Sequence, residues 1–211
     1  MMNKLLDVEK LSYSYDNINN VLNDVDLTIY KNQIISLYGP SGSGKSTLLF
    51  IIGNLIKNYT GSVKSYFNND FDKIGFIFQN FNLLKELTVF ENCKVAQNIR
   101  GLENKNEIIE FSEMMGIKDL LDRYPSQLST GQMQRAAILR AVVGGTELIL
   151  CDEPTAALDS ENKENIMQLM QKLSSNRTFF IASHDEIIKK YSETSYYIVD
   201  GKIKGMENDN N

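Results

Sequence analysis

The strongest strand signals in the chain are four short runs of consecutive, largely apolar residues. They lie at 34–37, 74–78, 148–151 and 179–182. Such runs are typical of strands buried on both faces, which favours a parallel sheet over an exposed antiparallel one. Helical patterns follow three of them, at 45–56, 161–173 and 186–190. A strand followed by a helix, repeated along the chain, predicts an α/β fold with a mainly parallel sheet.

Two regions depart from this order. Residues 5–29 indicate short strands broken at 16–17 and 23–24, which predicts an antiparallel β unit beside the main sheet. Residues 88–122 have helical periodicity without a strand candidate, which predicts a helical insertion. The polar end of the chain, 206–211, is expected to be frayed.

Composition and charge narrow the class of protein. The 211 residues are 42% hydrophobic and 23% charged, as in one globular domain. A net charge of −5 argues against a protein that neutralises nucleic-acid backbones, so no nucleic-acid partner is expected. Two cysteines without a CxxC spacing exclude a disulfide framework and a cysteine-based zinc site. With no signal peptide and no apolar run of about 18 residues, we expect a soluble, cytoplasmic protein.

A phosphate-binding loop is predicted between the first strand of the apolar series and the helix that follows it. Eight residues there fit the pattern G-x-x-x-x-G-K-[ST], namely Gly39, Pro40, Ser41, Gly42, Ser43, Gly44, Lys45 and Ser46, and Thr47 follows them. Glycines let backbone N–H groups converge on phosphate oxygens, and the helix N-terminus adds a favourable dipole. Lys45 can reach the β and γ phosphates, and the Ser46 hydroxyl can bind Mg²⁺. The alternative, a surface turn, does not explain the strand and helix in register, so the loop predicts nucleoside triphosphate binding.

Two acids and a histidine follow later strands. Asp152 can hold Mg²⁺ or its water, and Glu153 can act as a general base on an attacking water. Taken alone, two acids after a strand more often form a helix cap or a solvated turn. His184, which follows the run at 179–182, is by itself more often structural than catalytic.

The order and spacing of these segments resemble the nucleotide-binding domain of ABC transporters over nearly the whole chain. Residues 39–46 are similar to the family's Walker A loop, 148–153 to Walker B, 128–132 to the signature and 157–159 to the D-loop. Gln79 resembles the Q-loop glutamine and His184 the switch histidine. Tyr15 matches the aromatic residue that stacks on adenine, with Tyr13 as the alternative.

The resemblance implies specific roles. Glu153, His184, Lys45 and Gln79 would be catalytic. Ser46, Gln79 and Asp152 would hold Mg²⁺. Besides Tyr15 and the Walker A loop, the nucleotide-contacting residues would be Ser129, Gly131, Gln132 and Asp159, which act on the ATP held by an opposing subunit.

The resemblance also implies an architecture and a function. A P-loop NTPase core of the RecA-like type, with an antiparallel β subdomain, would comprise 1–80 and about 146–211, and a helical subdomain about 81–145. The chain would be a cytoplasmic ATPase subunit, peripheral on the inner face of the membrane. It would dimerise head to tail and power a separate membrane permease. The segments 76–92 and 125–129 are especially similar to ATPases of the lipoprotein-release and macrolide-export type, which favours export or extraction.

The signature departs from the family pattern at one position. The signature has Thr130 where the family usually has glycine. A positive φ there would cost a β-branched residue roughly 1–2 kcal/mol, whereas a negative φ would cost little. The departure keeps open an ATP-gated scaffold with little turnover. There are two further alternatives. A soluble ABC ATPase acting on DNA or ribosomes is disfavoured by the acidic composition, and a P-loop kinase would leave the signature unexplained.

Overall fold

The centre of the molecule is a six-stranded sheet. The computed structural model describes residues 3–67 and 71–208. The sheet has the order β5-β6-β7-β3-β8-β9, and all neighbouring pairs are parallel except the β8–β9 hairpin at one edge. The six strands are β3 (Ile34–Tyr38), β5 (Ile74–Ile77), β6 (Leu148–Asp152), β7 (Thr178–Ser183), β8 (Thr194–Val199) and β9 (Lys202–Asn208). The mainly parallel α/β core predicted from the apolar runs is therefore confirmed.

A second, antiparallel sheet precedes it in sequence. Its order is β2-β1-β4, built from β1 (Lys4–Ser14), β2 (Asn20–Tyr30) and β4 (Thr60–Ser65). The antiparallel unit is confirmed, but the predicted strand break at 23–24 is wrong. β2 runs through this point, where Asp24 has a φ of 45° and the β1–β2 register shifts. Asp24 thus forms an irregularity within the strand and does not end it.

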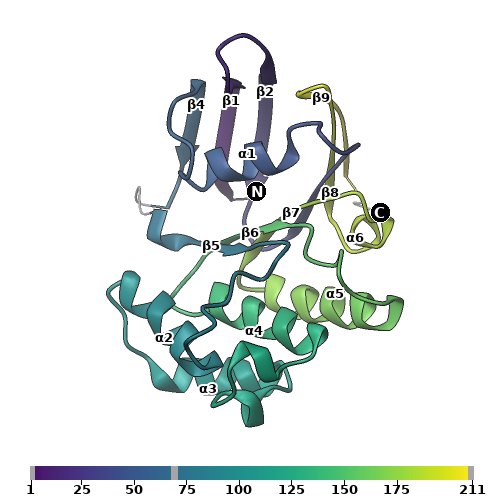
Figure 1. Cartoon of the computed structure of the whole chain (residues 1–211). Coiled ribbons are helices and arrows are strands. Elements are labelled where there is room, and N and C mark those ends of the chain that lie inside the picture. Colours follow the sequence, from purple (N-terminus) through teal and green to yellow (C-terminus); the bar gives the residue numbers. More distant parts are fainter. Residues whose placement is uncertain (1–2, 68–70, 209–211) are drawn as a thin grey trace.

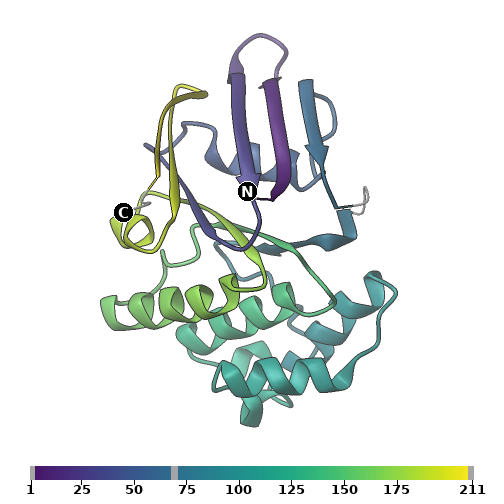
Figure 2. The same ribbon diagram turned by 180° about the vertical axis from the view of Figure 1, so that it is seen from behind.

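Helices cover both faces of the central sheet (Figures 1 and 2). The helices are α1 (Lys45–Ile52), α2 (Val89–Ile99), α3 (Lys105–Met114), α4 (Thr130–Val142), α5 (Ser160–Ser174) and α6 (Glu186–Lys190). Of these, α1 lies on one face of the sheet, α4 and α5 lie on the other, and α2 and α3 pack against α4. Short 3₁₀ turns lie at Phe71–Lys73, Lys118–Leu120 and Pro125–Gln127. Polar residues begin the longer helices. Thr88 and Glu91 form a capping box at α2, and Asn104 and Asp159 cap α3 and α5.

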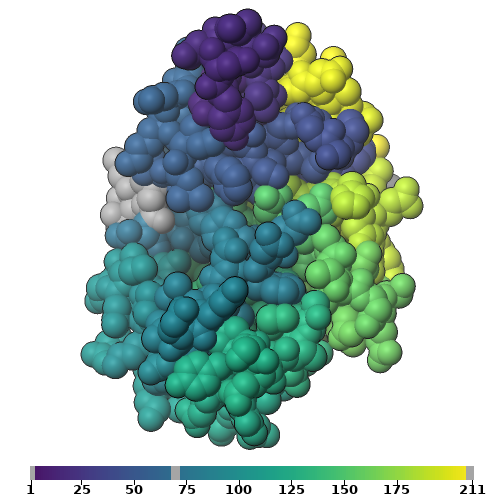
Figure 3. All heavy atoms as spheres, in the orientation of Figure 1, coloured from purple at the N-terminus to yellow at the C-terminus, as the bar shows by residue number. Residues whose placement is uncertain are grey.

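Two apolar cores follow from the pleat of the central strands. In β6, Leu148 and Leu150 pack with α1 and the antiparallel sheet, whereas Ile149 and Cys151 pack against the α4 and α5 side. Every side chain of β7 is buried. Burial on both faces explains why the central strands are runs of mostly apolar residues and do not alternate between apolar and polar positions. In Figure 3, the N-terminal sheet and the helices α2–α4 lie at opposite ends of the visible face.

Two predicted boundaries need correction. The helix expected to reach residue 56 ends at Ile52, because Gly53 caps it and the next residue, Asn54, has a left-handed φ of 60°. The tail was expected to fray from residue 206, yet β9 pairs with β8 as far as Asn208. Strand pairing supplies the order that the polar sequence did not indicate. Residues 209–211 lie outside the described part of the chain.

Candidate functional site

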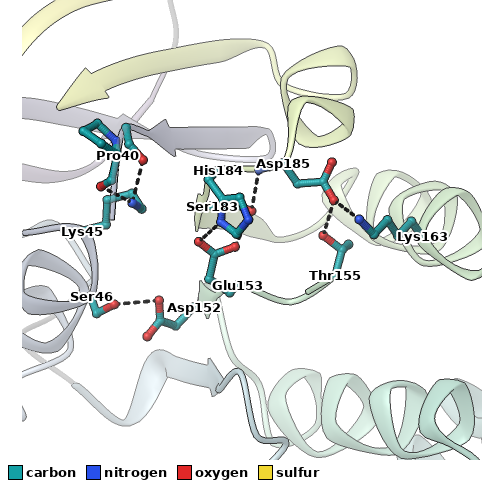
Figure 4. Close-up of polar contacts among 11 residues, drawn as sticks. Pro40, Lys45, Ser46, Asp152, Glu153, Thr155, Lys163, Ser183, His184 and Asp185 are labelled. Atoms are coloured by element: carbon teal, nitrogen blue, oxygen red, sulfur yellow. Dashed lines mark hydrogen bonds and ion pairs between the residues drawn. The ribbon is translucent and has the colours of Figure 1, made fainter. Parts of the chain in front are cut away.

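A cavity of about 530 Å³ lies where the carboxyl ends of β3, β6 and β7 meet the start of α1. Ligands of open α/β sheets bind at this edge. Its lining residues are Val21, Ser41, Gly42, Gly44, Lys45, Ser46, Thr47, Gln79, Asp152, Glu153 and His184. All but Val21 were predicted from the sequence. The structure therefore brings the phosphate loop, the two acids, Gln79 and His184 into one site, part of which Figure 4 shows.

The loop before α1 is shaped to surround an anion. Gly42 and Gly44 have φ values of 78° and 99°, which residues other than glycine adopt only with strain. A Cβ on Gly44 would lie 2.8 Å from the Val21 carbonyl oxygen. The buried Ser43 hydroxyl has no hydrogen-bond partner among the described residues. Left-handed glycines and an unpaired buried hydroxyl in one loop fit a bound triphosphate.

Lys45 projects its ammonium into this loop. The residue is only 7% exposed, and its Nζ donates to the carbonyl oxygens of Gly39 and Pro40 at 2.8 and 2.9 Å. Burial lowers the pKa of Lys45, and the charges of Glu153 and Asp152 oppose that shift. Because neutral carbonyl groups do not balance a full charge, the ammonium remains available to an anionic ligand.

Ser46 and Asp152 form the part of the site that could hold a cation. Ser46 is the second residue of α1, and its hydroxyl donates to Asp152 Oδ1 at 2.9 Å. Burial raises the pKa of Asp152 and the Glu153 charge adds to it, while Ser46 and Lys45 act in the opposite direction. A hydroxyl and a carboxylate in contact are the oxygen ligands that Mg²⁺ uses beside substrate phosphates.

Glu153 follows β6 in a strained backbone conformation, with a φ of 49°. Its N–H donates to the Ala182 carbonyl oxygen at 2.9 Å. Oε1 lies 2.8 Å from Nδ1 of His184, and Oε2 accepts a hydrogen bond from the Ser183 hydroxyl at 2.6 Å. Figure 4 shows the carboxylate next to these two side chains. A carboxylate held in this way beside the phosphate loop can act as a general base.

Tyr15 lies beside the phosphate loop. Its hydroxyl is 3.2 Å from Thr47 Oγ1, and its ring packs edge-to-face on Tyr13 with centroids 4.9 Å apart. The ring is mostly exposed, so a flat ligand could stack on it. The adenine-stacking role of Tyr15 stays a prediction.

The signature and D-loop residues do not line this cavity. Ser129 caps α4 and forms a capping box with Gln132. Gly131 faces Asn162, whose side-chain amide donates to both carboxylate oxygens of Asp159. These residues thus form a separate cluster at the start of α4 and α5, away from the phosphate loop of the same chain.

Thr130 is compatible with this arrangement. It is the first residue of α4, and its φ is negative. The strain that a left-handed conformation would impose on a β-branched residue is therefore absent at Thr130. The structure gives no reason at this position for a weakened signature.

Sequence reasoning missed two residues of the site, Val21 and Ser183. Val21 is one apolar residue among others in β2, and nothing in the local pattern marks it. Ser183 ends the apolar run of β7 directly before His184. A polar residue at the carboxyl end of a parallel strand is a signal that could have drawn attention to it.

Known proteins similar to this chain are ATP-binding proteins of ABC transporters, in agreement with a site for a nucleoside triphosphate. The family model for the ABC transporter matches residues 22–156. The lipoprotein-releasing system ATP-binding protein LolD of Bacteroides thetaiotaomicron is 37% identical, over 95% of this chain and 99% of LolD. The macrolide export ATP-binding/permease protein MacB of Shigella flexneri is 37% identical over 96% of this chain, which spans 34% of MacB.

A solved cassette has the same fold. The dimeric structure of MJ0796, an ABC transporter cassette whose sequence is from Methanocaldococcus jannaschii, aligns with a TM-score of 0.84 and 34% identity over 97% of this chain and 98% of that one. A post-hydrolysis state of MJ0796 bound to ADP and Pi aligns with a TM-score of 0.83. Within residues 3–67 and 71–208, no helix is both long and apolar enough to cross a membrane. The chain belongs to the ABC transporter family, as an ATP-binding cassette that hydrolyses ATP and is of the type found in LolD and MacB.

Proposed function

We propose that two copies of this chain close head to tail around two ATP molecules and drive a separate membrane permease, in export or extraction. The observation that carries the proposal is the separation of Ser129 and Gly131 from the phosphate loop of their own chain. The exposed start of α4 offers N–H groups and a helix dipole to an anion on another copy. A C₂ dimer would use both sites equally.

Within each site, the contacts support a division of labour. Lys45 would bind the β and γ phosphates, and Tyr15 would stack on the base. Ser46, Asp152 and Gln79 would hold Mg²⁺, which when bound neutralises phosphate charge. Glu153 would take the proton of the attacking water. His184, whose side chain is 72% exposed, would stabilise the γ phosphate.

Mixing two inactive variants tests the shared site. Lys45→Ala removes the phosphate-binding charge, and a bulky charged Ser129→Arg change blocks the contact from the opposing copy. Each variant alone should have little ATPase activity. In a mixed dimer, one of the two sites combines an intact Lys45 with an intact Ser129, so mixing should restore up to about a quarter of wild-type turnover. ATPase activity across mixing ratios is the measurement, and no recovery at any ratio argues against the shared site.

The permease is proposed to dock in a groove between β5 and α2. This cavity of about 350 Å³ is lined by Phe76, Phe78 and Leu84 among others, next to Gln79 in sequence. At its rim Ile99 is 74% exposed. An exposed apolar groove is typical of a surface that binds an apolar helix or loop of a partner. Docking there would hold the chain at the cytoplasmic face of the membrane.

Membrane association should therefore depend on Ile99. In native cells, Ile99→Asp is expected to lower the membrane-bound fraction of the chain by about tenfold, because a charge in a desolvated groove is unfavourable. Ile18→Asp is the matched control, since Ile18 is 82% exposed and lies in the β1–β2 loop. Sedimentation of the membranes gives the fraction directly. Equal losses in the two variants would count against the groove.

A further inference from the structure

Ser183 makes two hydrogen bonds at the end of β7, where it is 2% exposed. Its hydroxyl donates to Glu153 Oε2 at 2.6 Å, and its oxygen accepts from the backbone N–H of Asp185 at 3.1 Å. An N–H group can only donate. The Asp185 contact therefore occupies the acceptor side of the hydroxyl and directs its single proton to the Glu153 carboxylate.

The Asp185 N–H is itself held in place by contacts of the Asp185 side chain. The Asp185 carboxylate pairs with Lys163 of α5 at 2.5 Å and accepts from the buried Thr155 hydroxyl at 3.3 Å. It also caps α6 through the Ile187 N–H. Burial acts to raise the pKa of Asp185, but the bonds from Lys163 and Ile187 outweigh it and lower this pKa. Figure 4 shows the contacts of Asp185 with Lys163, Thr155 and Ser183. An ionised Asp185 thus fixes the donor that orients Ser183.

The two contacts of the Glu153 carboxylate differ in their surroundings. The His184 side chain, which approaches Oε1, is mostly exposed to solvent. Ser183, which binds Oε2, is enclosed in the sheet. The left-handed backbone of Glu153 adds strain that side-chain contacts must offset. Ser183 is therefore the fixed support of the carboxylate.

We infer that Ser183 is a positioning residue for Glu153, and that its hydroxyl holds the carboxylate in the orientation needed to take a proton from water. The inference rests on the proposed role of Glu153 as general base. Ser183 itself would contact neither ATP nor the reacting atoms. Its loss should lower kcat and leave the KM for Mg-ATP unchanged, because binding of the nucleotide does not use this hydrogen bond.

The test compares Ser183→Thr with Ser183→Val in the full chain. The two side chains have nearly the same shape and differ by the hydroxyl, so packing effects cancel between them. At saturating Mg-ATP, the Val variant should lose roughly 10- to 100-fold in kcat, as expected for one hydrogen bond to a charged group. The Thr variant should stay within about threefold of wild type. The KM of both should stay within about twofold.

Ser36→Ala is the matched control. Ser36 is equally buried in the sheet, and its hydroxyl bonds to Ser195 at 2.7 Å and not to the site. It should leave kcat within twofold of wild type. Equal kcat values for the Thr and Val variants, or a loss confined to KM, overturn the inference. Glu153→Gln shows whether the inference or the proposed function has failed. If the kcat of Glu153→Gln equals that of wild type, the role of Glu153 is wrong. If Glu153→Gln is inactive but the Ser183 variants keep the wild-type kcat, the role of Ser183 is wrong.

Discussion

Glu153→Gln is expected to abolish ATP turnover while ATP binding persists. Glutamine has the shape of glutamate and keeps an oxygen that can accept the Ser183 hydrogen bond, but it cannot take a proton from water. Loss of a general base costs about 10²–10⁴-fold in rate. Because hydrolysis no longer opens the assembly, the variant should accumulate as a dimer with Mg-ATP. ATPase assays and the mass in solution with and without nucleotide are the measurements.

Glu147→Gln provides the control for this prediction. Glu147 forms surface ion pairs with Lys31 and Lys73, away from the cavity. Its substitution should leave turnover and the nucleotide-dependent mass unchanged, since exposed ion pairs contribute little to stability. A Glu153→Gln chain that stays monomeric at saturating ATP would contradict a homodimer, and a chain that no longer binds ATP would contradict the assigned role.

The central sheet could be predicted because its strands carry their signal locally. A strand buried on both faces is largely apolar, and β3, β5, β6 and β7 each contain a run of mostly apolar residues. The polar strands β4 and β9 gave no such signal. β4 is mostly exposed and is ordered by pairing with β1, and β9 by pairing with β8. Their order comes from pairing with another strand, distant β1 for β4 and the neighbouring β8 for β9, and the polarity of their own residues does not reveal it.

The same distinction holds in the site. The phosphate loop could be predicted because glycines, lysine and hydroxyl occupy consecutive positions that one ligand requires. The conformation of Thr130 could not, because the sequence allows either sign of φ and the capping of α4 by Ser129 decides it. Ser183 gains its role only when the ends of β6 and β7 are adjacent. Contacts between strands, and not residue types, create that part of the site.

Asp152→Asn is expected to stabilise the nucleotide-free protein and to impair turnover. Burial and the nearby Glu153 charge raise the pKa of Asp152 above its ordinary 3.8. A raised carboxyl pKa means that the folded state holds the proton more tightly than the unfolded state. The stability from this group is full below the unfolded pKa and is lost as the pH rises through the folded pKa. At pH 7 the ionised group therefore opposes folding, and asparagine removes this cost while its Oδ1 can still accept from Ser46.

Thermal unfolding between pH 4 and pH 8 measures the effect. Tm should rise at pH 7, and the gain should shrink towards pH 4. For a chain of this length, each 1 kcal/mol of relief corresponds to about 2–4 °C in Tm. kcat should fall by at least about tenfold, because the carboxylate proposed to hold Mg²⁺ is gone. Asp159→Asn is the control, because its pKa shift has the opposite sign: the Asn162 N–H lowers the pKa of Asp159. Loss of the Asp159 charge should therefore not raise Tm. If the protein is more stable with a neutral residue at position 152, the Asp152 charge serves the chemistry of the site and not folding. A lower Tm for Asp152→Asn than for wild type at pH 7 would refute this conclusion.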